Sequence, residues 1–176
     1  KEMIAIPSQS FEEEAVCSHI CGWMEKKGIS HERVGNNIIC RNNPGSTSQM
    51  LLCAHIDTVK PSEDYSFNPY TPDYKTAAEV VSRITGRSLN EEDVVAGLGS
   101  NDDGASVVSM IAAYRYISEQ ENAKDLILVL TCEEDAVGLE EQCARMQIRM
   151  IHAAATSHAD VAALAAVPLD QVNAMM

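Results

Sequence analysis

Basic and aromatic residues are scarce in this chain of 176 residues. Thirteen lysines and arginines stand against 26 aspartates and glutamates, so the formal net charge is −13 with the five histidines counted as neutral. A surface this acidic repels nucleic-acid phosphates and anionic lipid headgroups, which argues against nucleic acid and membranes as partners. Aromatic residues make up only 5% of the chain, and clefts that stack bases or sugars usually contain more. The composition favours a globular domain that tolerates cations.

Long apolar runs and closely paired cysteines are missing as well. The longest apolar runs, such as residues 126–130, fall far short of the ~20 residues that a membrane helix needs. The first residues lead into three glutamates, which is not a secretion-signal pattern. The six cysteines include no Cys-x-x-Cys pair, so we expect reduced thiols in a cytoplasmic protein. A metal held by Cys17 and Cys21, which are four residues apart, is an alternative that no second pair supports.

The first half of the chain predicts a helix and two strands. Ser10 and Glu13 form a capping-box pattern before apolar residues at helical spacing, so a helix is expected from there to Gly28. Its predicted core face comprises Phe11, Val16, Ile20, Trp23 and Met24. Short apolar runs at residues 37–40 and 50–54 flank an Asn-Asn-Pro-Gly turn, and we expect them to pair as neighbouring strands.

The second half alternates between helical and strand patterns. An irregular loop, a short helical stretch and a longer amphipathic helix are expected at residues 61–74, 77–84 and 105–118. Residues 126–131 form an unbroken apolar run, which is typical of a strand buried on both faces. The alternation predicts an α/β fold with a doubly wound, mostly parallel sheet and flanking helices.

Three clusters of polar residues fall where a predicted strand ends or a helix begins, the edge at which open α/β sheets bind ligands. The first contains His55 and Asp57, which point to the same side because strand side chains alternate. A neutral imidazole suits zinc, and a nearby carboxylate can fix the tautomer of the ring. A strand-end histidine beside a solvated aspartate is the alternative for this pair taken alone.

The second cluster is the glycine-rich stretch at residues 97–106, which contains Asp102 and Asp103. Glycines permit a tight backbone path, and carboxylates at a helix start meet its positive end. The stretch has no lysine and its two aspartates would repel phosphate, so a cation is the better ligand. Capping of the following helix by one of the aspartates is the alternative.

The third cluster is Glu133, Glu134 and Asp135, which come directly after the buried strand. Three adjacent acids repel one another unless a cation or a proton lies among them. One glutamate can bind a metal while its neighbour acts as a general base on a bound water. A solvated acidic loop is the alternative for this motif taken alone.

In this order, the three clusters resemble the co-catalytic zinc metallopeptidase and deacylase family, which includes acetylornithine deacetylase, succinyl-diaminopimelate desuccinylase and related aminoacylases and peptidases. The similarity covers residues 1 to about 141 and is greatest to acetylornithine deacetylase-like members. It is carried by His-Ile-Asp-Thr-Val-Lys-Pro, Gly-Leu-Gly-Ser-Asn-Asp and the opening Ile-Ala-Ile-Pro-Ser, at residues 55–61, 97–102 and 4–8. It implies a partial catalytic domain at residues 1–150. The alanine-rich residues 151–176 are expected to be helical because of their composition.

The resemblance also implies roles for single residues. His55, Asp102 and Glu134 would bind metal, with Asp102 bridging two zinc ions. Asp57 would orient His55, and Glu133 would be the general base and acid. The peptide bond after Asp102 is commonly cis in such enzymes. Cobalt or manganese are alternatives to zinc.

The implied activity is metal-assisted hydrolysis of the N-acyl amide of a small amino acid such as acetylornithine. The alternatives are a dipeptidase or aminoacylase that acts on short peptides, and a non-catalytic metal-binding or interaction domain. A later acidic ligand and the C-terminal histidine of the family are not evident, and His158 is only a weak candidate for that histidine. The lid domain through which such enzymes form homodimers is not evident either. We therefore expect the chain to be either part of a longer enzyme or a truncated relative that cannot hold two zinc ions.

Overall fold

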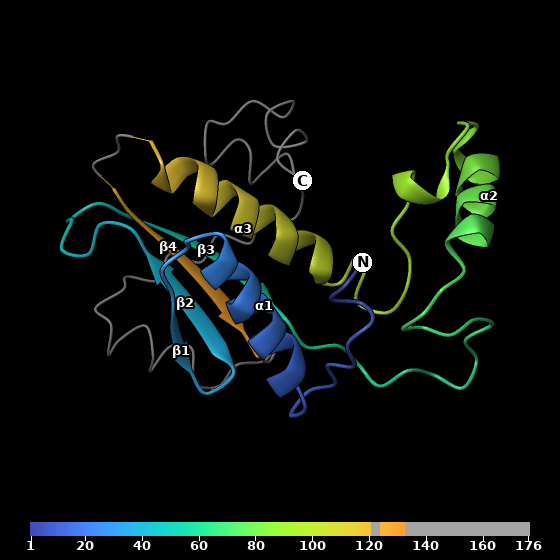
Figure 1. The fold of residues 1–176 in the computed structure, drawn as a ribbon, viewed down its shortest axis with the longest axis horizontal. Coiled ribbons are helices and arrows are strands. Elements are labelled where there is room, and N and C mark those ends of the chain that lie inside the picture. Colours follow the sequence, from blue (N-terminus) through green and yellow to red (C-terminus); the bar gives the residue numbers. More distant parts are fainter. Residues whose placement is uncertain (121–123, 133–176) are drawn as a thin grey trace.

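A four-stranded sheet with two helices packed against it forms the body of the computed structural model, which describes residues 1–120 and 124–132 (Figure 1). The predictions for Glu133, Glu134, His158 and the segment at residues 151–176 lie outside the described residues. The strands are β1 (Glu32–Val34), β2 (Asn37–Arg41), β3 (Gln49–His55) and β4 (Asp125–Thr131). The helices are α1 (Glu14–Lys26), α2 (Tyr74–Thr85) and α3 (Gly104–Ser118), with a short 3-10 turn, η1 (Glu91–Asp93), after α2.

The apolar strand β4 lies inside the sheet, whose order is β1-β2-β4-β3. All seven residues of β4 are buried, as predicted. It pairs antiparallel with β2 and parallel with β3, so the predicted pairing of β2 with β3 is wrong. The physical reason is the composition of β4, because a strand apolar at nearly every position is most stable with neighbours on both edges and cover on both faces.

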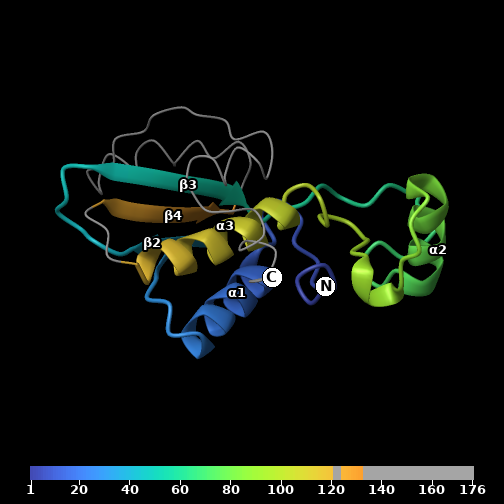
Figure 2. The same ribbon diagram turned by 90° about the horizontal axis from the view of Figure 1, so that it is seen from above.

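An α/β fold with flanking helices is confirmed, but the described sheet is mixed rather than mostly parallel. Of its three strand pairs, β1–β2 and β2–β4 are antiparallel and β3–β4 is parallel. In the described part of the chain, α1 and α3 both lie on one face of the sheet (Figure 2). Because β3 and β4 are parallel, their carboxyl ends lie at the same end of the sheet, and the candidate site is located there.

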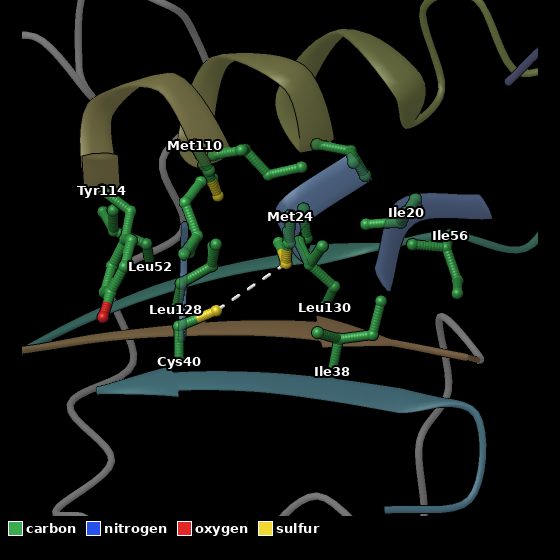
Figure 3. Close-up of a cluster of buried hydrophobic side chains, with 14 of the residues drawn as sticks. Ile20, Met24, Ile38, Cys40, Leu52, Ile56, Met110, Tyr114, Leu128 and Leu130 are labelled. Carbon is green, nitrogen blue, oxygen red and sulfur yellow. Dashed lines mark hydrogen bonds between the residues drawn. The ribbon is translucent and has the colours of Figure 1, made fainter. Parts of the chain in front are cut away.

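The main core lies between the two helices and the sheet (Figure 3). Helix α1 contributes Ile20 and Met24, and α3 contributes Met110 and Tyr114, all of them buried. They pack against alternate side chains of the strands, including Ile38, Cys40, Leu52, Leu128 and Leu130. Burial raises the pKa of the Cys40 thiol to about 12, so this cysteine is a buried thiol of the core with little thiolate character.

The start of α1 differs from the prediction. The helix begins at Glu14, and Ser10 does not cap it; the Ser10 hydroxyl instead donates to Asp57 Oδ2 at 2.6 Å. Two residues of the predicted core face are exposed, since Phe11 is 81% and Trp23 37% exposed. Phe11 precedes the helix, and its backbone N–H donates to the side chain of Glu13. The predicted end is close to the observed one, because α1 stops at Lys26, two residues before Gly28.

Helix α2 lies outside the layers of the sheet and its two helices (Figure 2). It confirms the short helix predicted at residues 77–84, and begins three residues earlier because Asp73 caps it by accepting from the Lys75 backbone N–H. Gly86 ends it in the left-handed conformation, with φ at 68°. Among the described residues, no helix has the length and apolar character needed to cross a membrane.

Candidate metal centre

The carboxyl end of β3 places the first candidate ligand, His55, at the edge of the sheet. Figure 2 shows that this end of β3 points toward the start of α3, which follows Asp102 and Asp103 in the sequence. His55 pairs with Thr131, the last residue of β4. Because β3 and β4 are parallel, the chain leaves both strands at the same edge, and Glu133 follows Thr131 by two residues.

The imidazole of His55 lies between two carboxylates. Its Nδ1 is 2.9 Å from Asp57 Oδ1, and its Nε2 is 3.1 Å from Asp102 Oδ1. Asp57 is buried, whereas the side chain of Asp102 is 83% exposed. A ring N–H donated to a buried carboxylate leaves the other ring nitrogen as the one that binds a metal. The structure thus brings His55, Asp57 and Asp102 together, and the metal-binding and orienting roles implied by the resemblance stay predictions.

The glycine-rich turn brings Asp102 to this edge. Gly97 and Gly99 have φ values of 118° and 72°, which side chains rarely adopt. A Cβ at Gly99 would lie 2.6 Å from Thr58 Cγ2, so this glycine also lets the turn approach the chain directly after Asp57. The Asp102–Asp103 peptide bond is cis, as the resemblance implied.

Two further residues contact the site: Asp103, which belongs to the second predicted cluster but was given no role of its own, and Ser10, which was not assigned to the site from the sequence. Asp103 Oδ2 accepts from the backbone N–H of His55 at 3.3 Å, and the Ser10 hydroxyl donates to Asp57. Both contacts join residues 47 or 48 positions apart. No local pattern marks such a pair, because periodicity reports only on near neighbours in the chain.

The charges around His55 act on its protonation in opposite directions. Burial alone lowers its pKa, but the hydrogen bonds to Asp57 and Asp102 and the charges of Asp103 and Asp57 outweigh burial and raise the pKa overall. The same carboxylates that stabilise a protonated imidazole would stabilise a metal cation.

The donor atoms fit a zinc ion in type and spacing. Zinc binds imidazole nitrogen and carboxylate oxygen at ~2.0–2.2 Å with tetrahedral angles, so two donors on one ion lie about 3.3 Å apart. The observed distance of 3.1 Å between His55 Nε2 and Asp102 Oδ1 is close to this value. Within residues 1–120 and 124–132, no group of three or more His, Cys, Asp or Glu side chains is arranged to hold a metal. This part of the chain thus supplies two candidate ligands.

Replacing Asp57 by asparagine is expected to weaken zinc binding by about 10–100-fold, the usual cost of losing a partner behind a metal ligand. The amide is isosteric but holds the Nδ1–H of His55 less strongly. Zinc affinity measured by competition with a chromophoric chelator tests this. Asp64→Asn is the matched control, because Asp64 is an exposed aspartate that contacts Ser62. An unchanged affinity in Asp57→Asn would show that Asp57 does not orient His55.

Comparison with solved structures shows that the fold is similar to that of part of three known proteins. Aminoacylhistidine dipeptidase from Vibrio alginolyticus has a TM-score of 0.50 and 22% identity, over 77% of this chain and 27% of that chain. Human carnosine dipeptidase 1 has a TM-score of 0.52 and 18% identity, over 82% and 33%. An M20 family metallo-carboxypeptidase from Sulfolobus solfataricus has a TM-score of 0.52 and 14% identity, over 82% and 32%. These likenesses show the fold, and the chain spans between 27% and 33% of the length of the three proteins.

Comparison with family models gives the sequence relationship. A search of curated proteins found no match. The model of peptidase family M28 matches residues 37–171, which include His55, Asp102 and Glu133. The expected resemblance to co-catalytic zinc metallopeptidases is therefore confirmed. The chain belongs to peptidase family M28, a family of co-catalytic zinc peptidases.

Proposed function

We propose that the protein hydrolyses the amide bond of a short peptide or an N-acyl amino acid at this metal centre. The observation that carries the proposal is the placement of His55 between the buried carboxylate of Asp57 and the exposed carboxylate of Asp102. With the Nδ1 proton donated to Asp57, Nε2 of His55 and a carboxylate oxygen of Asp102 would be available to a common cation. A cleft of about 920 Å³, lined by His55, Asp57 and Asp103 among others, adjoins it and offers room for a small substrate.

In this hydrolysis, different residues would bind the metal, orient a ligand and transfer the proton. His55 and Asp102, with Glu134, would hold the metal, and Asp57 would keep the metal-binding nitrogen of His55 unprotonated. Zinc supplies acidification of a water and polarisation of the acyl carbonyl. Glu133 would accept the proton of the attacking water and return it to the nitrogen of the leaving amine. The bond that breaks is the C–N amide bond, and the products are a carboxylic acid and an amine.

The identity of the substrate distinguishes two forms of the proposal. The motifs favour a deacylase acting on a substrate such as acetylornithine, because the similarity of residues 55–61 and 97–102 is greatest to acetylornithine deacetylase-like enzymes. The match to a peptidase family favours a dipeptidase. Both reactions use the same centre, so the geometry of His55 and Asp102 supports each of them equally.

The test is hydrolysis by the full-length protein with its metal content defined. Zinc-loaded protein is assayed against Nα-acetylornithine and a panel of dipeptides, with release of free amine as the readout. We expect hydrolysis of one class, its loss on dialysis against a chelator, and its recovery when zinc is restored. Protein that holds less than one zinc per chain and hydrolyses neither class would instead support a non-catalytic binding domain.

A further inference from the structure

The segment before α1 runs beside the residues that follow β3. Gln9 forms a parallel bridge with Thr58. The Thr58 backbone N–H donates to the Ser8 carbonyl at 2.8 Å, and the Ser10 backbone N–H donates to the Thr58 carbonyl at 3.3 Å. These bonds fix the backbone of Ser10 next to the chain that carries Asp57. The segment is therefore a structural neighbour of the metal centre, although more than 40 residues separate the two in the sequence.

The side chain of Ser10 completes a chain of hydrogen bonds that ends at the metal-binding edge. Its hydroxyl donates to Asp57 Oδ2 at 2.6 Å, and the other oxygen of Asp57 contacts His55 Nδ1 at 2.9 Å. The far nitrogen of His55 faces Asp102 at 3.1 Å. Each carboxylate oxygen of Asp57 thus has a separate described partner, and these two contacts together fix the rotation of the carboxylate group.

Because Asp57 is buried, loss of the hydrogen bond from Ser10 should affect its carboxylate strongly. Asp57 is 6% exposed, so an oxygen that loses its donor is poorly compensated by bulk water. A carboxylate held at only one oxygen is free to rotate, and the hydrogen bond to His55 Nδ1 then loses its fixed direction. The tautomer of His55 depends on this direction, because a proton held on Nδ1 leaves Nε2 to bind the cation.

We propose that Ser10 is a positioning residue of the metal centre, which fixes Asp57 and through it the ring orientation and tautomer of His55. The proposal rests on the function proposed above only in taking His55 as a metal ligand. Ser10 itself touches neither His55 nor Asp102 among the described contacts. Its effect on zinc affinity should therefore be smaller than that of Asp57.

The experiment compares Ser10→Ala with wild type in two measurements that need no substrate. Zinc affinity, measured by chelator competition, should fall by about 5- to 10-fold, which corresponds to the net worth of one hydrogen bond. In the zinc-free protein, at a pH above the pKa of His55, ¹⁵N NMR of the imidazole should show mainly Nδ1–H in wild type and a mixture of tautomers in Ser10→Ala. Ser10→Thr retains the hydroxyl and should restore both readouts.

Ser62→Ala is the matched control, because Ser62 also donates to an aspartate, Asp64 Oδ2, but at an exposed position away from the site. It should change neither readout. Zinc affinity within twofold of wild type in Ser10→Ala, with an unchanged tautomer, would overturn the proposal. Failure of Ser10→Thr to restore affinity would also overturn it, since the hydroxyl would then not be the active group. Both readouts are independent of hydrolysis, so these results are separate from the test of the proposed function.

Discussion

The substitution Glu133→Gln is expected to lower turnover by about 10²–10⁴-fold, the usual contribution of a general base. Glu133→Gln keeps the shape of the side chain but cannot accept the proton of the attacking water. Zinc content should remain close to that of wild type, because the neighbouring Glu134 is the proposed ligand. The measurement is kcat on whichever substrate the wild-type protein hydrolyses, together with zinc per chain by atomic emission.

His55→Ala is the comparison that separates binding from proton transfer. Removal of a direct ligand should lower zinc affinity by more than the 10–100-fold expected for Asp57→Asn, and activity should fall with zinc content. Glu133→Gln that retains near-normal kcat would contradict the role of Glu133. Glu133→Gln that loses zinc to the same extent as His55→Ala would make Glu133 a ligand instead of a base.

The part of the site at the end of β3 was predictable from the sequence. The alternation of strand side chains predicts His55 and Asp57 on one side, and the structure places their side chains 2.9 Å apart although β3 ends at His55. The contact between His55 and Asp102 joins residues 47 positions apart, and periodicity does not report on such separations. It was anticipated only because the two motifs occur together in a known family.

Contacts that depend on chain topology were missed for a common reason. Ser10 has the local pattern of a helix cap, yet its hydroxyl bonds to Asp57, because the pairing of Gln9 with Thr58 brings the two segments together. The same limit applies to the sheet, where residues 37–40 and 50–54 were correctly predicted as strands but not as separate neighbours of β4. Local composition determines the type of element, while the partner of an element depends on competition among all strands.

The position of β4 inside the sheet links the stability of the fold to the site. β4 pairs with β3 along its whole length, from Gln49 with Asp125 to His55 with Thr131. Because this pairing is continuous, the register set at Asp125 also sets the position of His55, which lies at the other end of the strand pair. Asp125 lies far from the metal centre along β4. A substitution there is therefore expected to change the free energy of unfolding more than it changes the site.

Asp125→Ala is expected to lower the free energy of unfolding by about 3–4 kcal/mol. Asp125 is fully buried, and its Oδ2 accepts from both Nε and Nη2 of Arg41, whose side chain is 19% exposed. Its Oδ1 accepts from the backbone N–H of Asn43 at 3.4 Å. The truncation leaves the Arg41 guanidinium largely buried without this carboxylate, which costs more than the pair itself contributes. Urea denaturation followed by circular dichroism measures the change.

The double variant Asp125→Ala/Arg41→Met tests whether the buried charge of Arg41, once Asp125 is removed, causes the loss. Removing both charged groups should recover part of the stability, because an apolar pair of similar volume often replaces a buried ion pair at little cost. Glu14→Ala is the matched control, since the ion pair of Glu14 with Arg33 is exposed and should contribute far less. If Asp125→Ala destabilised the protein no more than Glu14→Ala, the buried pair would not hold the start of β4. If the double variant were as unstable as Asp125→Ala, the loss would come from the other contacts of Asp125, and the order of the strands would depend on apolar burial along β4 rather than on this ion pair.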